Sequence, residues 1–299
     1  MQSQNLSIGL DKFEAILPVV KQPLPNGFFV NQRLELDGAI GYWNASASYP
    51  VFQMQGPWTI SHEQLWRSVG NPALRYLASA DEDLSFLVDL NDELRSLILV
   101  DAQGYENAIS KLSNLRTLIL DGGSEDLIDF TNLNRLRFLT MNFRDCVGFE
   151  HLTSLQSFST GGKNHPESLN YLRTFTELKW LVLAQSRRVQ DLTALNELSS
   201  LEWLWLQGLP KVSRLPNLSI FSELKRLELF NLIHATVDVS ELLELESLEL
   251  FRAFRVNIEN LEKLKLRQDV SIGIAVSQKD LGVDGKYHWM SDRYVGEYD

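Results

Sequence analysis

Histidine and cysteine are the side chains of this chain best suited to bind a metal ion or to act as a nucleophile. The chain has 299 residues, with one cysteine at Cys146 and histidines at His62, His151, His165, His234 and His288. The histidines do not share the short spacings at which zinc ligands cluster. We interpret His165 and His234 as solvated loop residues. The sequence therefore predicts no metal and no cofactor.

Motifs that mark catalysis are also missing from the sequence. There is no phosphate-binding loop, no G-x-G-x-x-G, no G-x-S-x-G and no Cys-x-x-Cys pair. Asp121 and Glu125 flank two glycines, which is most simply a turn. We therefore expect a protein that is not an enzyme.

A short phrase, Leu-x-x-Leu-x-Leu, recurs along most of the chain. It begins at Leu94, Leu115, Leu136, Leu155, Leu178, Leu201, Leu224 and Leu245, in steps of 19 to 23 residues. Self-similarity at this period predicts a solenoid. In a strand, alternate side chains face opposite ways, so the fourth and sixth positions point together into the solenoid and the fifth points outward.

The phrase resembles the leucine-rich repeat family, in its short bacterial type. Units such as LVLAQSRRVQDLTALNELSS carry the resemblance, which covers about Leu74 to Leu266, with weaker units at Leu74 and Leu261. It implies an α/β fold: a horseshoe-shaped leucine-rich repeat solenoid with a parallel sheet on its concave face. The segments between the strands are too short for long helices, so we expect brief helical turns or irregular arcs on the convex side. In the family, the position of Cys146 holds an inward apolar side chain, so we expect Cys146 in the core.

Two departures from the family pattern predict an irregular scaffold. Many members place Asn or Cys at the ninth position of the unit, whereas this chain has Ala102, Gly123, Arg144, Ser186, Leu209, Leu232 and Ala253 there. The loop backbone must then pair with itself or with water. In the unit at Leu155, Phe158 and Thr160 replace leucines, and we expect a local bulge or a longer loop after them.

The outward positions between the leucines are where we place the function. Ile98 and Ile119, in the first units, are expected under the N-terminal region. The later units carry the predicted partner-binding residues: Phe138, Trp180, Trp203, Trp205, Arg226, Glu228, Phe230, Glu249, Phe251 and Arg252. Trp and Arg dominate binding hot spots. The alternative is that the tryptophans fold flat over the sheet, or that a terminal segment covers them.

Three regions are expected along the chain. Residues 1–70 form a β-rich N-terminal cap with one or two hairpins around Asp37-Gly38 and a helix capped by Ser61; residues 71–268 form the solenoid; residues 269–299 form a C-terminal cap and tail. The alternative for the first region is a separate ligand-binding module that uses Trp43, Trp58 and Trp66.

The charge balance bounds the kind of partner. The formal net charge of −11 argues against a nucleic-acid binder, which needs a basic surface. It is compatible with a basic protein partner. The sequence shows neither a signal-peptide pattern nor a membrane span, so we expect a cytoplasmic protein with no membrane partner.

Together these features predict a non-enzymatic protein–protein interaction module that binds through its concave face. In a sharper version, it is an immunity or antitoxin-like protein that neutralises a cognate toxin, such as a basic nuclease. The alternatives are a bacterial effector or adhesin that binds a host protein, and an enzymatic or ligand-binding role of the N-terminal region.

Overall fold

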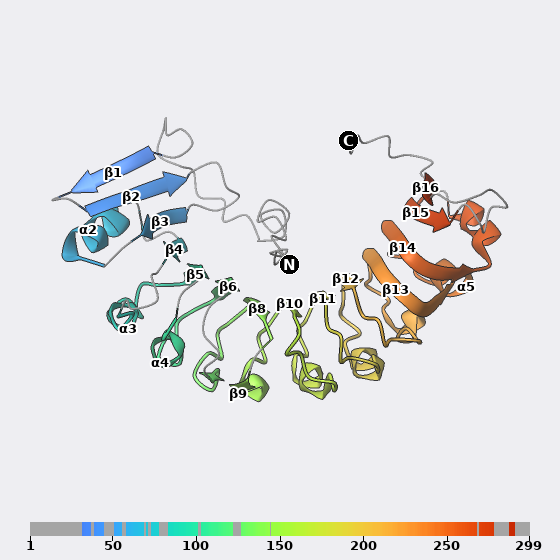
Figure 1. Cartoon of the computed structure of the whole chain (residues 1–299), viewed down its shortest axis with the longest axis horizontal. Coiled ribbons are helices and arrows are strands. Elements are labelled where there is room, and N and C mark those ends of the chain that lie inside the picture. The colour runs from blue at the N-terminus through green and yellow to red at the C-terminus, as the bar shows by residue number, and fades with distance from the viewer. Residues whose placement is uncertain are drawn as a thin grey trace. The chain divides into compact units, whose positions relative to one another are not determined.

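The computed structural model describes the chain in several stretches, which form two compact units. It describes residues 32–36, 39–44, 51–55, 58–68, 70, 73–77, 83–100, 103–121, 127–143, 145–267, 269–277 and 287–290. The units are Met1–Ser124 and Glu125–Asp299 (Figure 1). Each unit is treated by itself below.

Unit 1 combines antiparallel strands with the first parallel repeats. Its strands follow the chain order, with β1 (Gln32–Leu36), β2 (Ala39–Asn44), β3 (Val51–Gln55), β4 (Ala73–Leu77), β5 (Ser96–Val100) and β6 (Thr117–Asp121). The first three strands pair antiparallel, which confirms the predicted hairpins, and β3 to β6 pair parallel. Its helices are α2 (Ile60–Ser68), α3 (Phe86–Asp89) and α4 (Glu106–Ile109). The residues of the Asp37-Gly38 turn lie outside the described residues.

The helix predicted after the hairpins is present, but its cap is not Ser61. Ser61 lies inside α2. Thr59 is the capping residue, because its Oγ1 accepts the His62 N–H at 3.4 Å, while its own N–H donates to His62 Nδ1 at 3.3 Å. His62 thus takes the role that Glu or Gln has in a capping box, a substitution that the S/T-x-x-E/Q pattern does not find.

Two of the N-terminal tryptophans have structural contacts. Trp66 is fully buried, and Trp58 stacks on Phe86 with ring centroids 4.7 Å apart. These contacts account for both side chains as packing within unit 1. The side chain of Trp43 is outside the described part of the chain.

Unit 2 is a run of parallel strands with one antiparallel strand at its end. The order is β8 (Phe138–Asn142), β10 (Ser157–Gly161), β11 (Trp180–Ala184), β12 (Trp203–Gln207), β13 (Arg226–Asp238), β14 (Leu250–Glu259), β15 (Ser271–Ser277) and β16 (Tyr287–Met290). Strands β8 to β15 pair parallel and β16 pairs antiparallel to β15. A separate pair, β7 (Ile128–Asp129) and β9 (Cys146–Val147), lies outside this run.

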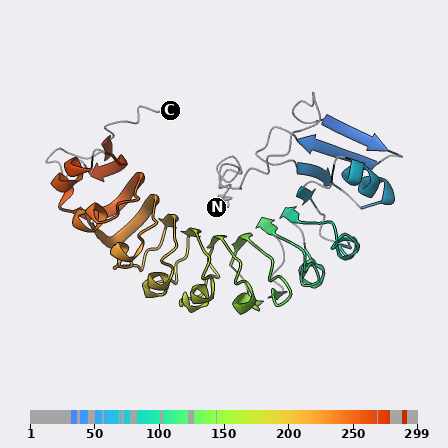
Figure 2. The ribbon, with the colours of Figure 1, turned by 180° about the vertical axis from the view of Figure 1, so that it is seen from behind.

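Short helical turns return the chain from one strand to the next, as predicted. They are η1 (Phe149–His151), η2 (Asn170–Thr174), η3 (Thr193–Glu197), η4 (Leu218–Ile220) and α5 (Val239–Leu243), followed by η5 (Leu261–Leu266). Figure 2 shows them on one side of the strands. They are brief because the units are short: equivalent positions of β11 and β12, such as Trp180 and Trp203, are only 23 residues apart.

The leucine phrase forms the core between strands and turns. At the fourth and sixth positions, Leu181 with Leu183 and Leu204 with Leu206 have no exposed surface. Each such burial contributes about 1.5–3 kcal/mol relative to an exposed side chain. The first leucine of the phrase lies in the turn before the strand, where its backbone is hydrogen-bonded: the Leu178 N–H donates to the Phe175 carbonyl at 3.0 Å. One leucine pattern therefore specifies both the strand and the turn that precedes it.

Backbone groups replace the missing asparagine ladder. After β10, β11 and β12, the next residue donates its N–H to the fifth residue of the following strand: Gly162 to Ala184, Gln185 to Gln207, and Gly208 to Phe230, at 2.7–3.1 Å. All three donors have positive φ, from 54° to 96°, which turns the N–H toward the neighbouring strand. This confirms that the backbone satisfies itself without Asn or Cys at the ninth position.

The register of the last repeats differs from the one predicted. Leu250 of β14 pairs with Arg226, so the unit begins at Leu248 rather than Leu245. Two leucine registers fit the segment LLELESLEL, and Leu245 is instead buried in the turn that follows the unusually long β13. The weak unit predicted at Leu261 is the 3-10 helix η5, and β15 supplies the next parallel strand.

The unit at Leu155 is more regular than predicted. Strand β10 pairs with both neighbours without a register shift. The connection 162–169 is as long as 185–192 in the next unit, so neither the expected bulge nor a longer loop forms. Phe158 fills the inward position and packs edge-on against Phe175, with ring centroids 5.5 Å apart.

Substituting Gly161 tests how tightly β10 packs against β11. A Cβ at Gly161 would overlap the Ala184 carbonyl oxygen and lie 2.8 Å from its carbonyl carbon. Because that group belongs to the backbone of the next strand, we expect Gly161→Ala to lower the free energy of unfolding by about 1–3 kcal/mol. Urea denaturation followed by circular dichroism measures this. Ser157→Ala in the same strand removes only a hydroxyl and serves as the control; equal midpoints for the two variants would contradict the predicted clash.

Candidate functional site

The outer face of the strands in unit 2 carries a group of aromatic and charged side chains. We call this group the aromatic face. It consists of Phe138, Trp180, Trp203, Trp205, Arg226, Glu228, Phe230, Arg252 and Phe254. The parallel register places these residues in three rows across the strands: Phe138–Ser157–Trp180–Trp203–Arg226, Trp205–Glu228–Arg252 and Gln207–Phe230–Phe254, in which Ser157 and Gln207 complete the rows. Neighbours in a row are about 4.8 Å apart at the backbone, close enough for side chains to touch.

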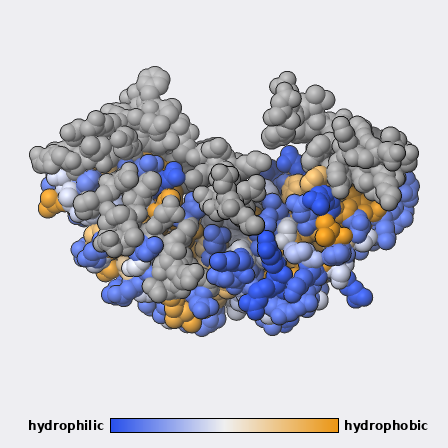
Figure 3. All heavy atoms as spheres, in the orientation of Figure 1, coloured by the Kyte–Doolittle hydropathy of each residue, from blue (hydrophilic) through white to orange (hydrophobic). Residues whose placement is uncertain are grey.

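Ring contacts join the rows into one surface. The Trp203 and Trp205 ring centroids are 6.0 Å apart, and those of Trp205 and Phe230 are 5.5 Å apart. The Trp205 Nε1–H donates to Gln207 Oε1 at 3.2 Å, which fixes the indole over β12. Figure 3 shows apolar side chains over β13 and β14 with hydrophilic side chains beside them. Ile233, in β13, is 46% exposed.

A small residue lets the first part of the aromatic face form. Phe138 and Trp180 lie on strands that are separated by β10, yet their rings stack with centroids 6.0 Å apart and an interplanar angle of 23°. The residue between them in the row is Ser157, whose side chain is too short to keep the rings apart. Ser157 is buried. A larger residue at this position would separate Phe138 from Trp180.

The acidic group on the aromatic face is neutralised by its neighbour. Glu228 is only 4% exposed, and Arg252 Nη1 lies 3.4 Å from its Oε2. A buried carboxylate needs such a partner because its loss of hydration is otherwise uncompensated. At the strand entries, Glu202 binds Lys179 at 2.7 Å and Lys225 at 2.9 Å. Hydrogen bonds from these two lysines lower the pKa of Glu202.

Two side chains on the aromatic face have donor groups that could bind a partner. Trp203 is 7% exposed, and its buried Nε1 has no hydrogen-bond partner among the residues that the structure describes. Arg226 is exposed and its Cζ lies 5.9 Å from the centre of the Trp203 ring. Among the described residues, Arg226 forms no ion pair.

The structure brings most of the predicted binding residues together on the aromatic face, but two of them do not lie on it. Phe251 has no exposed surface and belongs to the core opposite Leu227, so its predicted outward position is wrong. Glu249 is exposed but precedes β14 and does not join the aromatic face. Phe254, which the sequence reading missed, takes the row position next to Phe230. Starting the unit at Leu248 would have found it.

Exposure on the face is uneven. Trp203 is nearly buried, whereas Trp180 and Trp205 are half-buried, so the two alternatives of exposed and self-covered tryptophans each describe part of the face. In unit 1, Ile98 is 2% exposed, whereas Ile119 is half-buried. That the N-terminal region covers these two isoleucines stays a prediction.

His165 is not the solvated loop residue that the sequence suggested. It has no exposed surface. Its Nδ1 donates to the Pro166 carbonyl at 2.9 Å, which leaves Nε2 to accept from the Tyr171 hydroxyl, also at 2.9 Å. Burial lowers the pKa of His165 from 6.5 to about 4, and burial raises the pKa of Tyr171 well above its usual range. The ring of Phe143 packs on His165 at 4.7 Å.

The other candidate chemical groups do not assemble into a centre. Cys146 is half-buried rather than in the core, and His234 is exposed, although in β13 and not in a loop. In the part of the chain that the structure describes, no three His, Cys, Asp or Glu side chains are placed to hold a metal ion. None of the described helices is long and apolar enough to cross a membrane.

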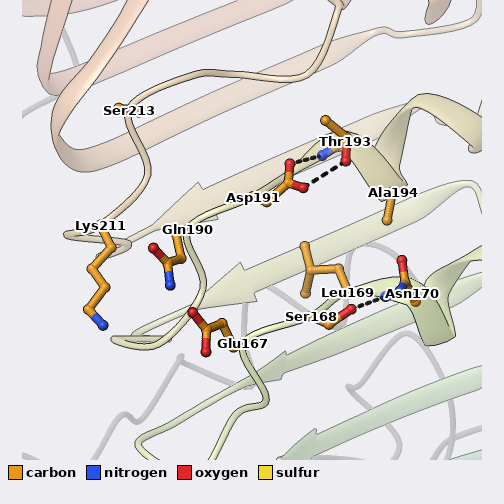
Figure 4. A pocket seen from close by; sticks show the side chains of 10 residues that line it. All are labelled: Glu167, Ser168, Leu169, Asn170, Gln190, Asp191, Thr193, Ala194, Lys211 and Ser213. Atoms are coloured by element: carbon orange, nitrogen blue, oxygen red, sulfur yellow. Dashed lines mark hydrogen bonds between the residues drawn. The ribbon is translucent and has the colours of Figure 1, made fainter.

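An open depression of about 650 Å³ lies between neighbouring turns of unit 2. Figure 4 shows Glu167, Gln190 and Lys211 at one end of it. At the other end, the Asp191 carboxylate accepts from the Thr193 N–H at 2.8 Å and from its hydroxyl at 2.9 Å. The Asp191 carboxylate is therefore engaged in a local turn.

The repeat, the parallel strands and the leucine core give this chain the fold of a leucine-rich repeat solenoid. No family model matches the sequence, and no curated protein matches it.

Solved structures with a similar chain path include three bacterial proteins. An internalin from Listeria monocytogenes is 14% identical, with 76% of this chain and 86% of that chain covered and a TM-score of 0.48. The functional domain of InlJ from the same species, which includes a cysteine ladder, is 16% identical over 64% of this chain and 46% of that chain, with a TM-score of 0.45. A leucine-rich repeat protein of Leptospira interrogans is 17% identical over 75% and 71%, with a TM-score of 0.41. The fold assignment rests on the strand pairing of this chain, and these likenesses add nothing about its function.

The buried histidine predicts a specific loss of stability in acid. Because the folded pKa of His165 is depressed, the unfolded state binds the proton first, and stability is lost as pH falls from about 6.5 to about 4. We expect about 3 kcal/mol of this loss between pH 7 and pH 4 to disappear in His165→Gln. Urea midpoints of both proteins at both pH values measure it. Carboxyl groups such as Glu202 contribute the same background to each protein, so an identical pH dependence would contradict the assignment.

Proposed function

We propose that unit 2 binds a partner protein through the aromatic face, without catalysing a reaction. The observation that carries this proposal is the contact chain from Trp203 through Trp205 to Phe230 on the outer side of the sheet. The scaffold does not need large aromatic side chains there, because its core lies on the other side of the strands. Contiguous apolar surface rimmed by polar groups is typical of an interaction site.

The composition of the aromatic face fits the anatomy of a binding hot spot. Trp, Tyr and Arg are enriched where truncation costs most of the binding energy. Trp180, Trp205, Phe230 and Phe254 are half-buried, so each retains ring surface to bury. The parallel strands hold these side chains at fixed spacing, which limits the conformational entropy lost on binding.

Other expectations from the sequence remain proposals. Residues 1–70 and 269–299 are proposed as caps of the solenoid, and the cytoplasmic location stays a prediction. A secreted effector or adhesin would use the same face on a host protein. For an enzymatic or ligand-binding role of the N-terminal region, the described residues show no group of side chains that supports it.

Truncating the two half-buried tryptophans tests the proposed function. We expect Trp180→Ala/Trp205→Ala to weaken partner binding by about tenfold or more, because the partner would lose the surface that it buries against both indole rings. The whole chain serves as bait for proteins of the organism that encodes it, and calorimetry then measures affinity for each purified partner. Trp203 is left intact because it is nearly buried and its loss would disturb folding.

A matched control separates a binding effect from a folding effect. Leu127 is 52% exposed, lies in unit 2 and is not part of the aromatic face, so Leu127→Ala is expected to bind normally. Circular dichroism and thermal melting show whether both variants fold. A folded double variant that binds each partner as tightly as the wild type would refute the proposed site.

An immunity or antitoxin-like role is the second candidate, and the net charge of −11 favours it. The aromatic face does not carry that charge, because Glu228 is paired with Arg252. The acidic groups elsewhere would instead steer a basic toxin during encounter. We expect the association rate to fall by about tenfold or more as salt is raised, as measured by stopped-flow fluorescence. A rate that does not change with salt would remove the support for a basic partner.

A further inference from the structure

We infer that the partner inserts a carboxylate, next to an apolar side chain, between Trp203 and Arg226 of the aromatic face. This inference rests on the proposed function and specifies its chemistry. The acceptor is the carboxylate of an Asp or Glu side chain or of a chain terminus. Two independent observations carry it, one on each of the two residues.

The first observation is the unpaired indole of Trp203. Buried polar atoms in folded proteins nearly always have a hydrogen-bond partner, since a donor cut off from water is costly. Trp203 Nε1 is buried and has none within the described part of the chain, whereas Trp205 Nε1, on the same strand, is bonded to Gln207. An indole N–H can only donate. The missing partner must therefore be an acceptor.

The second observation is the unpaired guanidinium of Arg226. The neighbouring cations are occupied: Lys179 and Lys225 by Glu202, and Arg252 by Glu228. Arg226 is exposed, faces the Trp203 ring at 5.9 Å and has no ion pair among the described residues. A guanidinium binds a carboxylate through two parallel N–H groups. An acceptor that reaches Trp203 Nε1 therefore lies within reach of a cation suited to it.

The surroundings define what accompanies the carboxylate. Trp180 precedes Trp203 in its row, and Trp205 contacts both Trp203 and Phe230. An acidic group that enters here brings neighbouring atoms against aromatic rings, which favours an adjacent apolar residue. The negative charge of Glu228 does not oppose entry strongly, because Arg252 compensates it. The exposed Arg226 side chain can move aside and then close over the carboxylate.

Libraries of random displayed peptides, selected for binding to the full chain, provide a probe that needs no known partner. One library presents free C-termini, and a second embeds the random segment internally so that only side-chain carboxylates are available. We expect the full chain to select peptides with an acidic group beside an apolar residue. Enrichment in both libraries assigns an Asp or Glu side chain, and enrichment only with free C-termini assigns a terminal carboxylate.

Conservative variants then test the two residues. Trp203→Phe keeps the ring and removes the N–H, and Arg226→Gln removes the charge. Each is expected to weaken the selected acidic peptides by about tenfold to a hundredfold, and to have little effect on the same peptides with Asn, Gln or an amidated terminus. Arg173→Gln is the matched control, because Arg173 is a half-exposed arginine paired with Glu197 on a turn of unit 2.

A nuclear magnetic resonance signal separates binding from a structural role. The indole N–H resonance that is missing in Trp203→Phe belongs to Trp203, and it should move downfield when the acidic peptide binds, as it gains a charged acceptor. A resonance that does not move would overturn the inference, even if affinity falls.

The outcomes also separate this inference from the proposed function. Selected peptides that depend on Trp205 but carry no acidic group would overturn the carboxylate and leave the binding face intact. Peptides that bind Trp180→Ala/Trp205→Ala as well as the wild type, or a failure to select any peptide, would overturn both.

Discussion

The parallel register between successive units is the constraint on which the rest of unit 2 depends. No unit can bury its own leucines, so each strand must lie beside the next with inward positions aligned. Backbone hydrogen bonds fix this alignment at both ends of the strand: the Lys179 carbonyl accepts from both Glu202 and Trp203, and the Gly208 N–H reaches the Phe230 carbonyl. The close approach at Gly161 and the positive φ of Gln185 are consequences of the same alignment.

The same register creates the aromatic face. Once the inward positions are aligned, the outward positions are aligned too, and residues 23 or 24 apart in sequence become neighbours, such as Trp180 with Trp203 and Glu228 with Arg252. The size of each residue in a row then decides which side chains meet. Ser157 allows Phe138 to reach Trp180, and Gln207 is long enough to bond the indole of Trp205.

Charge on the aromatic face is nearly balanced, and this shapes its proposed specificity. Glu228 and Arg252 compensate each other, and Glu202 engages two lysines. What remains is a donor-rich pair, Trp203 and Arg226, in an apolar setting. The overall acidity of the chain and the chemistry of this face therefore point in different directions: the first acts at a distance and is screened by salt, whereas the second acts in contact.

The sequence by itself determined the solenoid, its strands, its short turns and the positions of Trp180, Trp203 and Trp205, because a repeated leucine spacing admits one inward side per strand. Tertiary structure decided what the repeat left ambiguous. Leu245 and Leu248 could each begin a unit, and only the packing after the long β13 sent Phe251 inward and Phe254 outward. His165 looked solvated in a Gly-rich, polar loop, yet it is buried, with the ring of Phe143 packed on it and the Tyr171 hydroxyl bonded to it. Periodicity fixes which way a side chain points, but neighbours from other units decide what covers it and what it pairs with.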